Sequence, residues 1–524
     1  MCTAVSIFND VLGPIMRGPS SSHTAGAYRI ARVGRALLGA EPTSARCAFD
    51  PGGSYAATHE SLGVDRAFCA GLLGWEMTDD RYASCVDAAR REGIDIAFSV
   101  EPLARADHPN AIRIDLAGRG GASLEIHARS TGGGAIDVTE VDGWPIRIDG
   151  RAWDIVAWVP KRAVEPARRA CREGTIDGVE LAHHVRDDRA ILHWRSRHPV
   201  DAERVMDLMR RLDGTRLTVS PPLFYVQVGP PLFASGGEAL ALADARGCSL
   251  GPLAMWHEMS FLGQSESRVM AEMARRYAIM KRAIETGQTE SAIAMPLTEP
   301  SAASVLAAER AGRLPLGGPQ TRAAARALAV MHVCNSQGVV CAAPTGGSAG
   351  VLPGVLSVLE EEGLADEATI LRSLFAASAI GLIVAARATF AAEIAGCQVE
   401  IGVAGAMAAA AVVEAAGGTA LQAADAASIA LQNTMGSVCD PVGGGCEIPC
   451  HTRNAAAASS AFTTADLVMG GYANPIPLDE AIDASLTVGM ALPPELRCTA
   501  QGGVAATPSA KRLCDRAARR ERRA

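Results

Sequence analysis

Short β-like runs, several of them alternating between hydrophobic and polar residues, dominate the first 150 residues of the chain. Alternation places apolar side chains on one face of a strand. The predicted strands are residues 47–53, 94–100, 111–118, 123–130, 136–141 and 144–150. Ahead of them, apolar residues recur at three- and four-residue spacing in residues 25–39, which predicts a helix. We therefore expect residues 1–150 to form an α/β or α+β domain.

A second pattern follows in residues 151–222, where strand-like and helix-like runs are shorter. Strands are predicted at 153–159, 179–185, 190–196 and 216–220, and helices at 163–174 and 201–212. This βαββαβ order is typical of a small ferredoxin-like module. Prolines 221, 222, 230 and 231 then deny the chain regular hydrogen bonding, so we expect a linker at residues 223–237.

Helical periodicity dominates the remainder, residues 238–508, which we expect to be an all-helical domain. Methionines recur with Val269 and Tyr277 at three- and four-residue spacing, a stripe interpreted as core packing. Gly- and Pro-rich loops interrupt the helices at residues 341–354, 395–402 and 437–454. The last residues, 509–524, are basic and helix-prone, and we interpret them as a solvated tail without a function.

Composition narrows the class of protein. The chain has 524 residues, of which 48% are hydrophobic and 20% charged, which indicates a folded protein of several domains. A net charge of −8 argues against nucleic acid or an anionic membrane as a partner. The N-terminus lacks signal-peptide features, and Glu414 and Asp425 interrupt the Ala-rich stretch, so no run of 18 strongly apolar residues is expected. We expect a cytoplasmic protein with no membrane partner.

Three of the fourteen cysteines stand in the Gly- and Pro-rich loops: Cys397, Cys439 and Cys450. Cytoplasmic cysteines are expected to be thiols, which serve as metal ligands, as reactive groups or as small buried side chains. The spacing between these three matches no zinc knuckle and no ferredoxin-type run, so spacing alone leaves ligation and burial open. Three ligands would leave one coordination position open, which suits a Lewis acid.

The string GPSSSHTAG places five polar residues directly before the predicted first helix. They are Ser20, Ser21, Ser22, His23 and Thr24. Hydroxyls and unpaired amides at a helix start favour an anion such as a carboxylate. The alternative is an ordinary helix cap with a surface histidine.

These strings together resemble a known family. SIFNDVLGPIMRGPSSSHTAGAYRIARVGRALLG and STGGGAIDVTEVDGW are similar to the β component of the iron–sulfur-dependent L-serine dehydratases, or L-serine ammonia-lyases. VVCAAPTGGSAGVLPG, GCQVEIG, CDPVGG, IPCHTRNA and QGGVAATP are similar to the α component. The resemblance implies a fused chain with a β-type domain first, then an ACT-like module, then an all-α catalytic domain. The segment PKRAVEPARR lacks the Gly-containing turn that receives an amino acid in such modules.

The resemblance also implies the chemistry. Cys397, Cys439 and Cys450 would hold a [4Fe-4S] cluster whose fourth iron faces a small amino-acid substrate, with no pyridoxal phosphate. Ser20 to Thr24 would bind the carboxylate, and His23 or His59 would remove the α-proton. Further substrate-binding candidates lie in the α-type loops: Thr345, Gly346, Ser348, Arg453 and Asn454.

Three strings depart from the family. Its GHGTD string is SLGVD here, so Leu62 replaces a histidine, and His59 is the candidate substitute. Its NNASISGA string is ARATFAAE, residues 386–393, and its TGGDA string is TEPSA, residues 298–302. The strings that the resemblance assigns to carboxylate and metal binding are present, whereas the strings expected to line the side-chain pocket differ from the family.

The predicted enzyme is a lyase that dehydrates and deaminates L-serine or a related β-hydroxy-α-amino acid. The alternatives are the same cluster with a larger β-hydroxy amino acid, sulfide elimination from cysteine, or a non-catalytic cluster-binding homologue. Because the metal loops and the GPSSSHT string lie far apart along the chain, we expect the site in an interdomain cleft. Large apolar helical surfaces make a homodimer the expected assembly.

Overall fold

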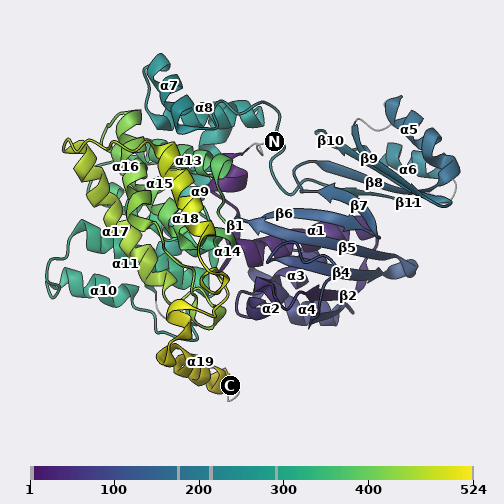
Figure 1. Cartoon of the computed structure of the whole chain (residues 1–524), viewed down its shortest axis with the longest axis horizontal. Helices are drawn as coiled ribbons and strands as arrows, with labels where there is room; N and C mark the ends of the chain where they lie inside the picture. Colours follow the sequence, from purple (N-terminus) through teal and green to yellow (C-terminus); the bar gives the residue numbers. More distant parts are fainter. Residues whose placement is uncertain (1–4, 174–177, 212–215, 290–292, 522–524) are drawn as a thin grey trace.

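The computed structural model describes residues 5–173, 178–211, 216–289 and 293–521. Two β-sheet regions lie beside a larger helical body (Figure 1). The predicted multidomain α+β architecture, with strands first and helices last, is confirmed. The first 150 residues and the region beyond residue 236 each carry a large buried apolar core.

The N-terminal domain is a six-stranded sheet in the order β3-β2-β4-β5-β6-β7. Only the β2–β3 pair is parallel in it. Helix α1 (Gly26–Leu38) buries an apolar stripe in this domain's core and ends at Gly39, whose φ of 65° suits glycine. The other elements are β2 (Pro42–Phe49), α2 (Ser54–Thr58), α3 (Val64–Leu73), α4 (Cys85–Arg91), β3 (Asp95–Val100), β4 (Ala111–Gly118), β5 (Ser123–Gly132), β6 (Ala135–Val141) and β7 (Trp144–Ile148).

The second region has the βαββαβ order predicted from the sequence. Its four strands form an antiparallel sheet in the order β11-β8-β10-β9. The predicted helix ends at residues 174 and 212 lie outside the described residues. The elements are β8 (Trp153–Pro160), α5 (Val164–Arg172), β9 (Val179–Arg186), β10 (Arg189–Ser196), α6 (Ala202–Arg211) and β11 (Arg216–Ser220). No helix or strand occurs from residue 221 to 235, all of which are described.

The helical domain is built around Ala-rich helices that pack closely because their side chains are small. Val269, Met273, Tyr277 and Met280 of α9 are buried in its core, so the interpretation of that stripe as packing is confirmed. The helices are α7 (Gly236–Arg246), α8 (Leu250–Leu262), α9 (Glu266–Gln288), α10 (Ala302–Arg310), α11 (Pro319–Asn335), α12 (Val351–Glu361), α13 (Glu367–Arg387), α14 (Ala392–Ala395), α15 (Ile401–Ala415), α16 (Ala420–Thr434), α17 (Cys450–Met469), α18 (Leu478–Met490) and α19 (Pro508–Glu521).

Two helical stretches correct the expectation that no apolar run is long enough to cross a bilayer. By length and composition alone, residues Glu367–Arg387 and Cys397–Ala415 are long and apolar enough to cross a bilayer. Within their most apolar windows, 78% and 94% of the residues are buried inside the protein. This burial is what core helices of a folded domain show.

The basic C-terminal segment is not a free tail over its described length. Its helix, α19, buries Ala510 against Val442 and Ala505, while its arginines stay exposed. The helix has one apolar edge, and that edge docks beside the loop between two of the predicted metal ligands, Cys439 and Cys450.

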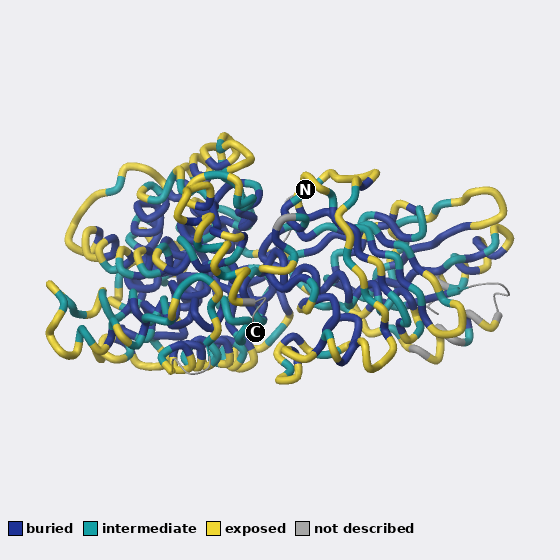
Figure 2. Tube along the Cα trace, turned by 90° about the horizontal axis from the view of Figure 1, so that it is seen from below, coloured by how far each residue is buried: buried dark blue, intermediate teal, exposed yellow. Residues whose placement is uncertain are grey.

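The N-terminal segment ties the sheet domain to the helical domain. Strand β1 (Ile15–Arg17) pairs antiparallel with β12 (Val339–Cys341), which precedes the TGGS loop. On α8, the Glu258 carboxylate accepts bonds from the Ser6 hydroxyl and from the amides of Ile7 and Phe8. Figure 2 shows buried chain in both bodies and where they meet. These ties hold the two halves of the predicted site together.

Candidate active site between the two domains

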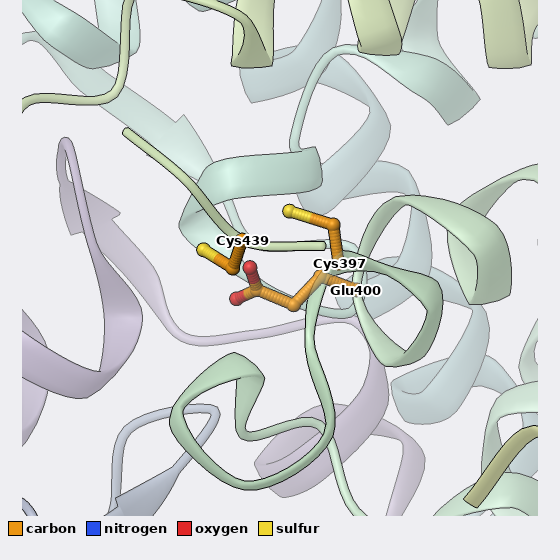
Figure 3. A group of neighbouring side chains, drawn as sticks. All are labelled: Cys397, Glu400 and Cys439. Carbon is orange, nitrogen blue, oxygen red and sulfur yellow. The ribbon is translucent and has the colours of Figure 1, made fainter. Parts of the chain in front are cut away.

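Two loops of the helical domain bring two of the predicted metal ligands together with an acid. Cys397 begins a short 3-10 turn, and Cys439 lies in the loop after α16. Their sulfur atoms and a carboxylate oxygen of Glu400 all lie within 4.8 Å of one another (Figure 3). Gly396, at φ 73°, permits this approach, because a Cβ there would meet the Ser437 carbonyl oxygen at 2.7 Å.

Cys498 adds a further thiol that the sequence analysis did not single out. The Cys439 thiol is in hydrogen-bonding contact with those of Cys397 and Cys498, and these contacts together with burial raise its pKa well above the usual range. The backbone N–H of Cys498 also donates a hydrogen bond to the carbonyl oxygen of Cys439, at 2.8 Å. The signal available in the sequence was the position of Cys498, three residues before the QGGVAATP string.

Cys450 starts α17 and lies beside Cys446 rather than in direct contact with Cys439. The Cys446 thiol hydrogen-bonds to that of Cys450 and is influenced by the Glu400 charge. A Cβ on Gly347 would lie 3.5 Å from Glu400 Oε2 and 3.7 Å from Cys446 Sγ, so this pair faces the same acid from another side. All four thiols are buried: Cys397, Cys439, Cys446 and Cys450.

Glu400 lies among these thiols and was not singled out from the GCQVEIG string. Burial, then the neighbouring Cys397 and Glu393, raises the pKa of Glu400 well above its ordinary value. Arg453 places a positive charge beside Cys397. Its Nη1 donates to Cys397 Sγ at 3.7 Å, and its Nη2 forms an ion pair with Asp440 at 3.0 Å. This group of sulfur and oxygen ligands beside a guanidinium could hold a metal ion or cluster.

The GPSSSHT string of the sheet domain forms the opposite wall. Residues Ser21–Ala25 make a single tight turn before α1, and His23 is fully buried, so the alternative of a surface histidine is wrong. His23 Nδ1 lies 3.1 Å from Ser20 Oγ, and its Nε2 lies 3.0 Å from Ser54 Oγ. Burial lowers the pKa of His23 to about 4, partly opposed by Glu393, so the imidazole is neutral at pH 7.

Two hydroxyls of this string hold the turn in place, one of them across the domain boundary. Ser21 Oγ accepts from the amide of Gly346, in the helical domain, at 3.3 Å. Thr24 Oγ1 donates to the carbonyl of Leu62 at 2.8 Å, so the residue that replaces the family histidine lies against this turn. The turn is therefore held from both sides.

The other predicted substrate-binding residues shape the helical wall. Asn454 donates to the Gly347 carbonyl at 2.8 Å and accepts from the Gly350 amide at 3.2 Å. Thr345 and Ser348 bond to each other at 3.0 Å and form a capping box. These side chains hold the TGGS loop in the shape that presents the Gly346 amide to Ser21.

Glu393 joins the two walls and was not among the predicted residues. Its carboxylate, from α14, lies 3.6 Å from His23 Nδ1 and accepts from Asn110 Nδ2 at 3.2 Å. Asn110 and His23 belong to the sheet domain, so side chains of both domains meet at this carboxylate.

His59 is not brought to this group. Its ring packs on Phe49 and Phe98, with centroids 5.2 and 6.3 Å away, and lines a separate cavity of about 310 Å³ that also contains Asp65. The physical reason is the helical turn of α2: Ser54 and Tyr55 contact His23, while His59 lies one turn further along. The structure therefore does not support His59 as the substitute for the missing histidine.

Comparisons with known proteins match both the helical and the sheet part of the chain. A family model described as "Serine dehydratase alpha chain" matches residues 199–505. The probable L-serine dehydratase alpha chain of Bacillus subtilis is 37% identical over 282 residues, covering 54% of this chain and 94% of that protein. The probable beta chain from the same organism is 43% identical over 145 residues, 28% of this chain and 64% of that protein. L-serine dehydratase TdcG of Escherichia coli is 34% identical over 280 residues, 52% and 61% of the two chains.

Proposed function

We infer that this chain, because it belongs to the serine dehydratase family and carries both its alpha-type and its beta-type regions, converts L-serine into pyruvate and ammonia. The observation that carries the proposal is the meeting of buried thiols with the buried His23 turn across one domain boundary. Serine loses water to give an enamine, whose tautomer hydrolyses to the 2-oxo acid.

The thiol group fits a [4Fe-4S] cluster held by Cys397, Cys439 and Cys450, because buried thiols converge on one acid from three loop segments. Such a cluster, when bound, would supply a Lewis-acidic iron that polarises the β-hydroxyl group of serine. Arg453, which donates to Cys397 Sγ, offsets the negative charge of the thiolates that hold it.

His23 is the candidate base for the α-proton. Its imidazole is buried and neutral at pH 7, so it is in the protonation state that can accept a proton. Ser20 and Ser54 fix the orientation of its ring through the two nitrogens. The hydroxyls and amides of residues 20–24 are the candidate donors to the substrate carboxylate.

The test is an assay of anaerobically purified protein for pyruvate and ammonia formed from L-serine, with L-threonine and L-cysteine tested in parallel. We expect equal amounts of both products from L-serine and preference for it over the other two amino acids. Sulfide release from cysteine at a higher kcat/KM would contradict the proposed substrate. Absence of turnover in iron-loaded protein would contradict the enzyme assignment.

Three further properties belong to the same proposal. The βαββαβ region is an ACT-like module, supported by its element order. The protein acts in the cytoplasm, where the thiols that the site requires stay reduced. The chain assembles as a homodimer. Its interface consists of exposed apolar residues of the helical domain, such as Leu467, Met469 and Tyr472. Light scattering of the purified protein tests this assembly.

A further inference from the structure

Glu393 has one oxygen that the protein leaves without a donor. Only 6% of the residue is exposed. Its Oε1 accepts from Asn110 Nδ2 and faces His23 Nδ1. Its Oε2 is buried and has no hydrogen-bond partner in the described part of the chain. Half of this carboxylate is therefore unsatisfied, at a point four residues before Cys397.

Asn110, in the sheet domain, also has a buried oxygen without a hydrogen-bond donor. It is fully buried, and its Nδ2 donates to Glu393 and to the Ser130 carbonyl. Its Oδ1 is buried and without a donor among the described residues. Two buried acceptors, one from each domain and on side chains bonded to each other, thus lack donors. Buried acceptors are normally satisfied, so this pair indicates a donor supplied by a ligand.

The charge around Glu393 indicates that this donor is a cation. Burial lowers the pKa values of His23 and His108, so both neighbouring imidazoles are neutral at pH 7. No lysine or arginine forms a salt bridge with Glu393 in the described residues. A buried carboxylate in such surroundings requires a positively charged partner.

We propose that Glu393 Oε2 and Asn110 Oδ1 form the subsite that binds the α-ammonium group of the substrate. The inference rests on the proposed function. An ammonium group brings one positive charge and three N–H donors, so it satisfies both acceptors and the carboxylate charge together. A hydroxy acid offers one neutral donor at the same place. The subsite therefore selects α-amino acids over the corresponding hydroxy acids.

The position of the subsite fits this role. Glu393 contacts His23, the candidate base, and stands four residues before Cys397, so an ammonium group held there brings the substrate close to the base and to the loop of a proposed metal ligand.

The test compares ligands that differ in the ammonium group, using iron-loaded full-length protein. L-alanine and L-lactate have no β-hydroxyl group to lose, so calorimetry measures their binding without turnover. We expect Glu393→Gln to weaken L-alanine binding and to raise the KM for L-serine about 10- to 100-fold. L-lactate binding should change less than threefold, and iron content should stay constant.

Two further variants keep the test decisive. Asn110→Ala should reproduce the selective loss of L-alanine binding if Glu393→Gln does not fold. Glu414→Gln is the matched control, because this buried carboxylate bonds to Ser249 at the far end of α15, about 20 Å along the helix from its first residue, Ile401, and its loss should leave both ligands unaffected.

Equal weakening of L-alanine and L-lactate, or no weakening of either, would overturn the subsite. Wild-type protein that binds the two ligands equally would also overturn it. These outcomes are distinct from failure of the proposed function, which would show as wild-type protein that does not convert L-serine.

Discussion

The cysteines of the sheet domain and those of the helical domain have opposite surroundings. Cys47, Cys69 and Cys85 stand on a strand or at helical positions, and all are buried in the apolar core of the sheet domain. Cys397 and Cys439 stand in loops and face each other and an acid. Both kinds are buried, so burial does not separate them. The difference teaches that the neighbours of a buried cysteine, other thiols and an acid rather than apolar side chains alone, mark it as a candidate ligand.

Replacing a cysteine with serine should have a much larger effect on iron content in the helical domain than in the sheet domain, and this is the largest effect we expect. Cys439→Ser removes a thiol from the group around Glu400, so we expect loss of bound iron and sulfide and of serine turnover. Cys69→Ser leaves that group intact and should cost only about 1 kcal/mol of stability. Iron and sulfide analysis of anaerobically purified variants measures this contrast. Full iron content in Cys439→Ser would break the comparison.

The Cys446 and Cys450 pair sharpens the comparison within the helical domain. Cys446 lies near Glu400 and its thiol hydrogen-bonds to that of Cys450, which is the proposed ligand. Cys450→Ser should therefore lose iron as Cys439→Ser does, whereas Cys446→Ser should retain more than half of it. The opposite pattern would transfer the ligand role to Cys446.

The contribution of the sheet domain to catalysis should be separable from metal binding. His23→Asn removes the candidate base, and we expect serine turnover to fall about 100- to 10,000-fold while iron content stays constant. His59→Asn changes a ring in a separate cavity, so its turnover should fall less than threefold. Steady-state kinetics together with iron analysis tests both statements. Unimpaired turnover in His23→Asn would show that the sheet domain does not supply the base.

The smallest expected effect is on the pH dependence of stability, and it comes from Glu258, a buried acid outside the candidate site. Burial raises the pKa of Glu258 from 4.5 to about 7, despite its bonds from Ser6 and the amides of Ile7 and Phe8. Because the folded pKa exceeds the unfolded one, this contribution to stability is fully present below pH 4.5 and is lost as pH rises through 7. Glu258→Gln should therefore make Tm less dependent on pH between 5 and 8, by thermal denaturation. An unchanged pH dependence would show that Glu258 does not titrate in this range.

Local patterns were sufficient for the elements and for part of the site. Strand alternation and the βαββαβ order predicted the sheet regions, because both depend on neighbours close in sequence. Cys397 and Cys439 were singled out by the loops that hold them, but their role as ligands was implied only by the resemblance to the family. His59 was chosen for its sequence proximity to Leu62, which says nothing about the direction in which a helix presents a side chain, and the structure places its ring in a separate cavity.

The amino-acid sequence by itself determined the family, the order of the domains and the residue types available for metal and carboxylate binding. Only the tertiary structure decided which of them meet. Glu393 and Asn110 carry no local signal, since each gains its role from a partner that is hundreds of residues away and across the domain boundary. Burial then sets their chemistry, because removal from water changes the protonation of histidines, acids and thiols according to neighbours that no local pattern specifies.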